Sequence, residues 1–406
     1  MNGDRAQRLV AIETHPIQYH APIYRLLQQR FEIPVTAIYG SDFSVAGYRD
    51  PEFGATFAWD TDLLGGYSPV FLSRVSNGGA RRAEAVSTGG LARALREAAP
   101  KAVLLTGYSP RFHQLAFCQA LAAKCPILFR GETTDHARRR MRLKSWARDR
   151  ALRWLYARCD MLLYVGQRSC VHFQRLGCPA DKLMFSPYCT DSTLLQRGEE
   201  ARSRLRPVVR RSLGINEEQM ALLFCGKLSQ RKQPHLILLA VRQLPVAVQE
   251  KTVILFIGDG EMRSSLGSIL EGAARSGPAP RALFLGFQNQ SCLSQYYHTA
   301  DLLVLPSQEH ETWGLVVNEA LDHGIPCVVS DQVGCAPDLI EPGLTGEICE
   351  AGSLSSLASA IQRAMVLTGR PEIREACRQR VSGYSVEKAA EGIARAYRSL
   401  FEQRRS

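Results

Sequence analysis

Short apolar runs alternate with helix-favouring stretches along the whole chain, and this alternation most narrows the possible folds. Short buried strands separated by helices are typical of parallel sheets covered on both faces. The series occurs twice, so the sequence predicts an α/β protein with two Rossmann-like, doubly wound domains and a cleft between them. The predicted strands are residues 8–13, 35–39, 102–106, 127–130 and 161–165 in the first half, and 221–225, 253–257, 282–285, 302–305 and 326–330 in the second.

The length of 406 residues also favours two domains. We expect a first domain over residues 1–196 and a second over 212–385. A polar stretch at 197–211, rich in Arg and Glu and interrupted by Pro207, is predicted to be the linker region. The last residues, 386–406, carry apolar side chains at helical spacing and predict one amphipathic helix.

Composition argues for an intracellular protein. No signal peptide and no apolar stretch of 18 residues is apparent, so we expect no transmembrane helix. The 12 cysteines are scattered without a CxxC pair, which predicts buried thiols in a reducing cytoplasm and no structural zinc. The net charge of +11 is concentrated in residues 138–158 and comes with no nucleic-acid motif, so we expect no nucleic-acid partner.

The second half has a candidate anion site where the strand at 302–305 ends. Gly314 allows a ligand to approach the backbone, and a helix begins there and runs to about His323. Its first amides lack intrahelical partners and suit a diphosphate. Glu311 precedes this helix and Glu319 lies inside it, so the two carboxylates could hold hydroxyls at two parts of one ligand. The alternative is a pair of solvated acids.

Glu311 and Glu319, with seven residues between them, resemble the Glu-x7-Glu signature of retaining GT-B glycosyltransferases of family 4. Other motifs agree in order and spacing, and the resemblance covers roughly residues 221–350. They are Phe-Cys-Gly-Lys-Leu-Ser-Gln-Arg-Lys at 224–232, Ile-Gly-Asp-Gly at 257–260, Phe-Leu-Gly-Phe at 284–287, and the Pro…Glu…Gly…Gly stretch at 337–346. The resemblance implies the GT-B fold, with the C-terminal helix crossing back to the first domain.

The resemblance also implies a role for each matching residue in transfer from a nucleotide-sugar. Lys227 and Lys232 would bind the donor diphosphate, Glu311 would hold the transferred sugar and Glu319 the ribose. The family usually has Arg where this chain has Lys227, which keeps the charge and loses the bidentate fork. The remaining donor-binding candidates are Gly226 in the lysine loop, Phe287 beside the base, and the amides of Gly314, Leu315 and Val316. No metal and no cofactor is implied, and surface polysaccharide or glycolipid assembly is the expected role.

The first half gives weaker signals for an acceptor. A loop of two histidines, Gln and Tyr between prolines follows the first strand, and we interpret His15 and Gln18 as acceptor or sugar contacts; a structural histidine is the alternative. Arg130 and Glu132 follow another strand and could bind acceptor hydroxyls or a phosphate, or form an ion pair that supports the loop. Asp60-Thr61-Asp62 spells a metal–diphosphate motif of another glycosyltransferase fold, but we expect no metal there.

The basic segment 138–158 could form an amphipathic helix with Leu143, Ala147, Ala151, Trp154 and Leu155 on one stripe. Such a helix can lie on an anionic membrane, which would put the protein on the inner face of the membrane near a lipid-linked acceptor. A solvated basic face of an ordinary helix is the alternative. For the whole chain, two other functions stay open: a nucleotide-sugar epimerase-like enzyme, and a non-catalytic GT-B binding protein.

Overall fold

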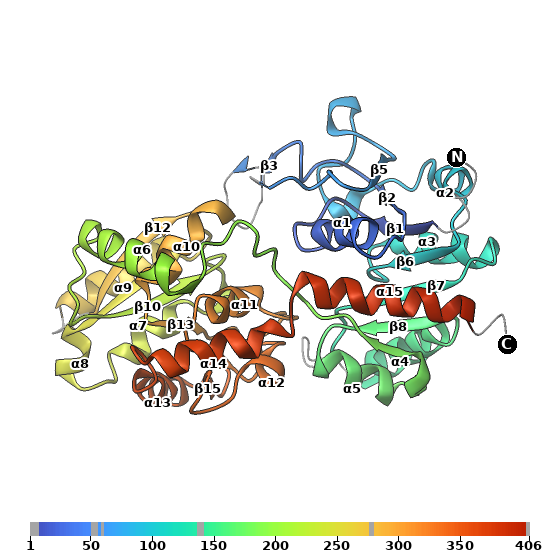
Figure 1. The fold of residues 1–406 in the computed structure, drawn as a ribbon. Coiled ribbons are helices and arrows are strands. Elements are labelled where there is room, and N and C mark those ends of the chain that lie inside the picture. The colour runs from blue at the N-terminus through green and yellow to red at the C-terminus, as the bar shows by residue number, and fades with distance from the viewer. Residues whose placement is uncertain (1–7, 50–55, 58–60, 136–141, 276–279, 403–406) are drawn as a thin grey trace.

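The computed structural model describes residues 8–49, 56–57, 61–135, 142–275 and 280–402. Two parallel sheets form the centres of two domains that lie side by side (Figure 1). The first sheet has seven strands in the order β5-β2-β1-β6-β7-β8-β9, and the second has six in the order β12-β11-β10-β13-β14-β15. In each sheet the order runs outward in both directions from one early strand, as in doubly wound folds.

The strands match the predicted apolar runs closely and add edge strands. The first sheet consists of β1 (Leu9–Glu13), β2 (Val35–Tyr39), β5 (Ser68–Phe71), β6 (Ala102–Leu105), β7 (Ile127–Gly131), β8 (Met161–Tyr164) and β9 (Leu183–Phe185). The second consists of β10 (Met220–Cys225), β11 (Thr252–Ile257), β12 (Arg281–Gly286), β13 (Leu302–Leu305), β14 (Cys327–Ser330) and β15 (Gly346–Cys349). A short antiparallel pair, β3 (Tyr48–Arg49) and β4 (Thr56–Phe57), lies apart from both sheets.

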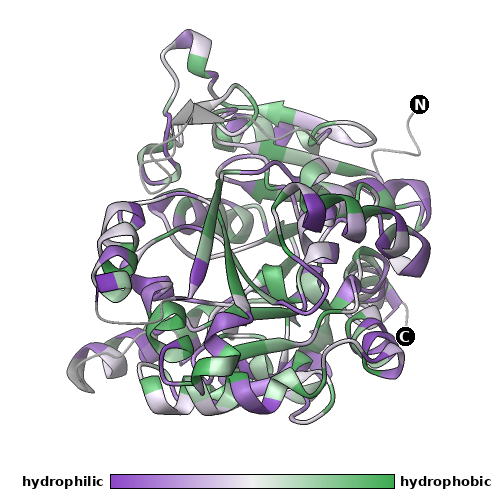
Figure 2. Ribbon diagram, turned by 90° about the vertical axis from the view of Figure 1, so that its left-hand side faces the viewer, coloured by the Kyte–Doolittle hydropathy of each residue, from purple (hydrophilic) through white to green (hydrophobic). Residues whose placement is uncertain are grey.

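Helices cover the sheets, so the central strands are buried on both sides. Every residue of β1, β2, β6, β11 and β13 is buried, and Figure 2 shows hydrophobic strands inside more polar helices. The first domain has α1 (Ala21–Gln29), α2 (Leu91–Ala98), α3 (Arg111–Ala122), α4 (Arg142–Tyr156) and α5 (Gln167–Arg175). The second has α6 (Gly198–Ser212), α7 (His235–Val241), α8 (Val246–Glu250), α9 (Arg263–Arg275), α10 (Gln290–Thr299), α11 (Leu315–Asp322), α12 (Ala336–Leu339), α13 (Leu354–Met365) and α14 (Pro371–Ser382).

The segment 197–211, predicted as a linker, is instead nearly all helix. It forms α6, which packs against α10 of the second domain. Its inner arginines explain this docking: Arg206 Nη2 donates to Asp301 Oδ1 (2.7 Å), and Arg210 Nη1 contacts Asp301 Oδ2 (3.3 Å). The chain therefore crosses between domains earlier, between the end of β9 and the start of α6. The polar composition misled the prediction because Arg210 is buried and Arg206 is half-buried, and both pair with the Asp301 carboxylate.

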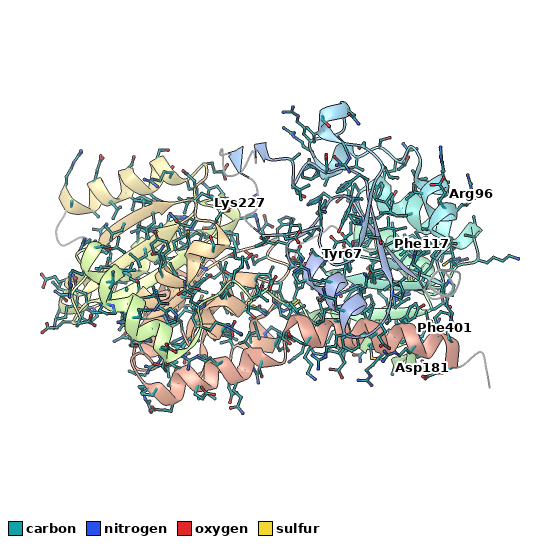
Figure 3. All side chains as sticks on the ribbon, turned by 45° about the horizontal axis from the view of Figure 1, so that its top comes forward. Tyr67, Arg96, Phe117, Asp181, Lys227 and Phe401 are labelled. Carbon is teal, nitrogen blue, oxygen red and sulfur yellow. The ribbon has the colours of Figure 1, made fainter. Side chains whose placement is uncertain are left out.

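The last helix, α15 (Val386–Glu402), returns to the first domain. It packs along α1, and its residues Ile393 and Tyr397 belong to the same hydrophobic core as Leu9 and Tyr24. Near the end of α15, the Phe401 ring centre lies 4.1 Å from the Lys101 ammonium. Figure 3 shows Phe401 on the side of the first domain that is away from the second domain. The chain thus passes between the domains a second time, between α14 and α15. None of the helices described is long and apolar enough to span a membrane.

Candidate functional site

A loop between β13 and α11 carries the predicted anion site. Gly314 precedes the first turn of α11 with φ 97°, a left-handed conformation that favours glycine. A Cβ there would lie 3.0 Å from Val333 and 3.1 Å from Leu305. The residue is buried, and Leu315 and Val316 behind it are half-buried. The helix therefore presents its first amides from a tightly packed loop, with the positive end of its dipole at the ligand side.

Glu311 and Lys232 form an ion pair at this loop. Lys232 ends a short 3₁₀ turn (Gln230–Lys232), and its Nζ lies 2.8 Å from Glu311 Oε2. The Ser307 hydroxyl donates to the same oxygen at 3.0 Å. Burial opposes the charge of Glu311, but the adjacent ammonium of Lys232 outweighs it and lowers the pKa of this carboxyl. The carboxylate is therefore ionised and oriented, as a residue that accepts hydrogen bonds from hydroxyls requires.

Glu319 has a different environment from Glu311. It is buried in α11, and Tyr297 of α10 donates its hydroxyl to Glu319 Oε2 at 2.6 Å. Burial raises the pKa of Glu319 to about 7, because no cation compensates for it as Lys232 does for Glu311. The two carboxylates of the Glu-x7-Glu pair thus differ in charge near neutral pH. Tyr297 was not predicted, since it lies 22 positions away in the sequence.

The lysine loop after β10 depends on close backbone contact with the turn after β11. Leu228 N donates to Asp259 O (2.9 Å), and Gly258 N donates to Gly286 O (2.8 Å). A Cβ at Gly258 would lie 2.0 Å from the carbonyl oxygen of Gly226, so this Gly-x-Gly turn is required for the approach. Lys227 and Phe287, the two other predicted donor residues of these loops, are half-buried. Figure 3 shows Lys227 on the side of the second domain that faces the first.

A cleft of about 430 Å³ lies between the domains, at the carboxyl ends of the first sheet's strands. The donor loop forms part of its wall through His310 and Thr312, next to Glu311. The first domain contributes mainly polar residues, namely Glu13, Thr14, His20, Thr106, His113, Glu132, Thr133, Thr134 and Arg148. Thr312 Oγ1 is 3.5 Å from Glu132 Oε2 across the domains, and burial raises the pKa of Glu132. Of the predicted acceptor residues, Glu132 therefore lies in this cleft.

Arg130 has a structural position rather than the predicted place among acceptor contacts. It is 3% exposed; Nη2 donates to Pro187 O (2.6 Å) and Nε to Ser186 Oγ (3.1 Å). Nη1 donates to His20 Nε2 (3.0 Å), and His20 Nδ1 donates to Glu13 Oε1 (2.7 Å). Both histidine bonds are satisfied when its proton is on Nδ1. The hydrogen-bond donors of the guanidinium are thus engaged in a buried network, which reaches Ser186 and Pro187 at the crossing between the domains.

Glu13 anchors this network and was missed by the sequence analysis. Burial opposes its charge, but His20 and the hydroxyl of Tyr24 lower the pKa of Glu13 to about 2. Its other oxygen accepts from Thr106 Oγ1 at 3.0 Å. A signal was available: an acid at the carboxyl end of a buried apolar strand lies where ligands bind in such sheets.

His15 and Gln18 do not line the interdomain cleft. His15 Nδ1 lies 2.8 Å from Thr14 Oγ1, and its ring packs on Phe43 with centroids 4.4 Å apart. Burial lowers the pKa of His15 to about 4, so it is a neutral packed side chain. The Gln18 side-chain oxygen is buried. Of the Asp-x-Asp tripeptide, Asp60 lies outside the described residues, while Asp62 Oδ1 accepts from the amides of Leu64 and Gly65 (3.0 and 2.9 Å), a turn-capping role.

Helix α4 carries the described part of the basic segment; residues 138–141 and the side chains of 142 and 143 lie outside it. The predicted stripe is divided: Leu155 is half-buried, whereas Ala147, Ala151 and Trp154 are exposed. Trp146, not predicted, is 63% exposed and Trp154 is 50% exposed. These tryptophans are eight residues apart and therefore share one outer helix face with the exposed Arg150.

The second half of the chain is similar in sequence to known glycosyltransferases. Residues 206–382 match the family model described as glycosyl transferases group 1. The D-inositol 3-phosphate glycosyltransferase of Geodermatophilus obscurus is 29% identical over 203 residues, 49% of this chain and 44% of the relative. The lipopolysaccharide 1,2-N-acetylglucosaminetransferase of Salmonella typhimurium is 28% identical over 203 residues, which cover 48% of this chain and 52% of the relative. The matched part spans about half the length of these curated relatives.

Solved structures match over nearly the whole chain. HepE of Anabaena in complex with UDP superposes with a TM-score of 0.70 at 16% identity, covering 97% of this chain and 100% of that one. Sucrose-phosphate synthase from Thermosynechococcus elongatus gives a TM-score of 0.69 at 17% identity, covering 98% and 100%. At such identities the likeness shows the fold, which is GT-B, as predicted. Residues 206–382 are therefore similar to the glycosyl transferases group 1 family, and they belong to a chain with the GT-B fold.

Proposed function

We propose that the protein is a retaining glycosyltransferase of family 4 that moves a sugar from a nucleotide-diphosphate sugar to an acceptor hydroxyl. The observation that carries the proposal is the buried Lys232–Glu311 pair at the loop that leads into α11. His310 and Thr312, on either side of Glu311 in this loop, line the interdomain cleft. A cation, helix amides and an ionised carboxylate at one strand-end loop fit a diphosphate joined to a sugar. The match to the glycosyl transferases group 1 model supports the same chemistry.

In this proposal the donor lies along the second domain. Lys227, Lys232 and the amides of Gly314, Leu315 and Val316 bind the diphosphate, and Phe287 and the Gly226 loop border the nucleoside. Glu311 accepts hydrogen bonds from the sugar, and Glu319 from the ribose. The bond from the anomeric carbon to the diphosphate oxygen breaks while the bond to the acceptor oxygen forms on the same face. The acceptor proton passes to the departing diphosphate, so no metal and no cofactor is required.

The interdomain cleft is the proposed acceptor site. Its polar lining suits saccharide hydroxyls, and Glu132 is the predicted residue that remains a candidate contact. Relatives named for lipopolysaccharide and inositol phosphate glycosylation support surface polysaccharide or glycolipid assembly as the role. An epimerase-like reaction would need a water or base in place of the acceptor, and the polar cleft beside the donor loop favours transfer.

A nucleotide-sugar screen tests the donor assignment. Thermal shifts with UDP-, GDP- and ADP-sugars should identify one base that stabilises the fold, because a bound donor raises stability by mass action. Product NMR with a competent acceptor should then give the same anomeric configuration as in the donor. Stabilisation by none of the nucleotide-sugars, or inversion at the anomeric carbon, would refute the proposal.

A specific observation favours a peripheral membrane location at the cytoplasmic face. Exposed Trp146 and Trp154 lie on the outer face of α4 together with Arg150, and Arg158 stacks on Trp154 at 3.9 Å. Aromatic rings among arginines suit the headgroup region of an anionic bilayer. At low salt the protein should sediment together with vesicles of phosphatidylglycerol. The Trp146→Ala/Trp154→Ala variant should stay in the supernatant. Equal sedimentation of both proteins would reject α4 as the contact.

A further inference from the structure

Trp313 lies in the sequence between two residues of the proposed donor site, and its side chain is buried. It follows Glu311 by two positions, precedes Gly314, and is 3% exposed. Its Nε1 donates to Asn318 Oδ1 of α11 at 2.7 Å. Its backbone oxygen accepts from Cys335 N at 2.9 Å. Ring, donor loop and the start of α11 are therefore bound together as one unit.

Both crossings between the domains pack on this ring. Tyr188, in the first crossing, stacks on Trp313 with centroids 5.6 Å apart and planes 22° apart. Tyr384, in the second crossing, lies 5.7 Å away at 35°. We call Tyr188, Trp313 and Tyr384 the hinge column. In a two-domain protein the crossings are the segments whose backbone angles change when the domains close.

The first domain contacts each end of the hinge column. Tyr188 N donates to Val165 O (3.2 Å), and the Arg130 guanidinium lies 5.6 Å from the Tyr188 ring centre. The Tyr384 ring meets the Phe185 ring of β9 edge-on, with centroids 5.7 Å apart. Its hydroxyl donates to Asp338 Oδ1 of α12 in the second domain (2.9 Å), and Gln167 N of α5 in the first domain donates to the same oxygen (2.9 Å). A shift of the first domain would therefore move both tyrosines against Trp313.

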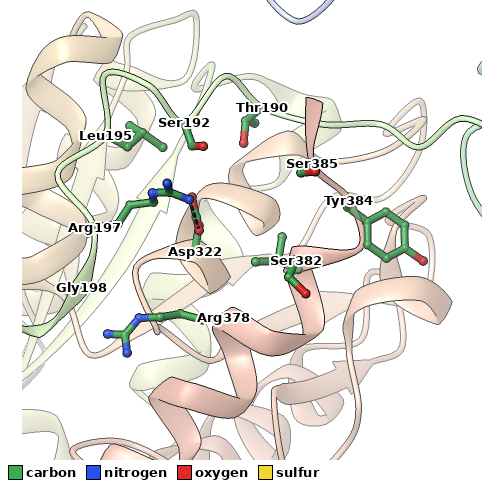
Figure 4. A pocket seen from close by; sticks show the side chains of 11 residues that line it. Thr190, Ser192, Leu195, Arg197, Gly198, Asp322, Arg378, Ser382, Tyr384 and Ser385 are labelled. Carbon is green, nitrogen blue, oxygen red and sulfur yellow. Dashed lines mark hydrogen bonds and ion pairs between the residues drawn. The ribbon is translucent and has the colours of Figure 1, made fainter. Parts of the chain in front are cut away.

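Tyr384 also lines a cavity of about 620 Å³, to which both crossings contribute residues (Figure 4). Thr190 and Ser192 line it from the first crossing, and Ser382 and Ser385 from the second. At its edge Arg197 Nη1 pairs with Asp322 Oδ1 at 3.1 Å. The crossings therefore border open space as well as packing on the indole.

We infer that Trp313 is a positioning residue that couples the interdomain hinge to the donor loop. Movement of the crossings is transmitted through the indole to Glu311 and Gly314, so donor affinity depends on the hinge. The inference rests on the proposed donor site, because it assigns a controlling element to that same loop. The ring touches neither donor nor acceptor in this scheme, and it acts only through the residues beside it.

Gly166 offers a direct test. It lies against the indole from the first domain: a Cβ there would be 2.3 Å from Trp313 Cζ3 and 3.0 Å from Asp338 Oδ1. Its φ of −177° is open to any residue, so Gly166→Ala wedges the ring without straining its own backbone. Gly383→Ala is the matched control, since Gly383 precedes Tyr384 with φ −71° and a Cβ there would meet nothing within 4 Å.

The readout is the dissociation constant of UDP, GDP or ADP, whichever stabilises the wild type most, measured by calorimetry together with the melting temperature. Gly166→Ala should weaken this binding about tenfold or more, and Gly383→Ala should stay within about twofold of the wild type. Trp313→Phe added to Gly166→Ala should recover most of the affinity, because the smaller ring relieves the overlap. A purely structural role would lower the melting temperature and leave the affinity unchanged.

A second pair of variants covers the case in which Gly166→Ala does not fold. Tyr188→Leu removes the stacked ring and should weaken nucleoside diphosphate binding, whereas Tyr188→Phe keeps the ring and should bind as the wild type does. Wild-type affinity in Tyr188→Leu, and in Gly166→Ala where that variant folds, would overturn the inference and leave the donor site standing. If the wild type binds none of the three nucleotides, the proposed function fails and the inference fails with it.

Discussion

The ammonium nitrogen of Lys232 lies 2.8 Å from a carboxylate oxygen of Glu311, and both side chains are about nine-tenths buried. Each charge is stabilised chiefly by the other, because burial has removed most of the surrounding water. The pair therefore links protein stability to the proposed chemistry: a substitution of either residue affects both. Variants that change one partner, or both together, separate the two effects.

We expect Lys232→Met and Glu311→Gln each to lower the free energy of unfolding by about 3 kcal/mol, because each leaves an unpaired buried charge. The double variant should recover most of that stability, since neither charge remains. Transfer activity should fall by roughly 100-fold or more in all three proteins, because the diphosphate loses its cation or the sugar its acceptor group. Urea unfolding and donor turnover give the two readings. Recovery of turnover in the double variant would contradict the assigned roles.

Glu319 predicts a pH dependence of stability. Its pKa rises from 4.5 to about 7 on folding, so between these values the folded protein keeps a proton that the unfolded chain has released. Its contribution to stability is complete below pH 4.5 and is lost as the pH rises to 7. Glu319→Gln should remove this dependence and stabilise the protein at pH 8 by on the order of 3 kcal/mol. Unfolding curves at pH 5 and pH 8 measure this change in the free energy of unfolding. If wild type and variant lose the same stability between the two pH values, Glu319 does not have the raised pKa.

Arg130→Ala should destabilise the fold rather than change acceptor preference. It removes the donors to Pro187 and His20 and leaves the buried Glu13 carboxylate without its distant cation. The expected loss is about 3 kcal/mol, or roughly 5 to 10 °C in melting temperature. Glu132→Gln, in the cleft, is the control and should melt within about 2 °C of the wild type. An unchanged melting temperature for Arg130→Ala, with loss of transfer, would return Arg130 to the acceptor site.

Gly258→Ala should displace the lysine loop. The new Cβ would overlap the Gly226 carbonyl at 2.0 Å, and φ is 119° at this position. We expect a cost of about 1 to 3 kcal/mol and at least tenfold weaker nucleoside diphosphate binding. Gly272→Ala, in the open on α9, provides the comparison and should stabilise the protein by about 0.5 to 1 kcal/mol. Donor affinity that is unaffected by Gly258→Ala would mean that the loop position does not matter for binding.

The sequence predicted those parts of the fold whose signal is local. Central strands such as β2 and β11 are buried on both faces and read as continuous apolar runs. The edge strand β5 was missed because its residues are mostly exposed and include Pro69. Strand β9 was missed because it has only three half-buried residues. At an edge, pairing with one neighbour replaces burial as the stabilising contribution, and that pairing leaves little trace in composition.

The distinction between local signals and long-range contacts also applies to the candidate site. Glu311, Gly314 and Glu319 lie within nine residues, so their spacing could be compared with a known motif. The partners of Arg130 lie 56 to 110 positions away, and no pattern in the sequence brings them together. His15 was predicted as an acceptor or sugar contact, with a structural histidine as the alternative; in the structure the chain turns after β1 and packs its ring on Phe43. Side-chain direction in a loop is decided by such tertiary contacts.

The return of α15 to the first domain has a consequence for biosynthesis. The core around Leu9 and Tyr24 includes Ile393 and Tyr397, so the first domain is completed only by residues that are translated after the second domain. While the ribosome is still making the second domain, the face of α1 that α15 covers is exposed to solvent and to other nascent chains. The core of the second domain lies almost wholly between Ile215 and Val381, so it does not depend on α15 for its completion. A ribosome that stops before α15 therefore releases a chain whose second half can fold and whose first half keeps an uncovered apolar surface.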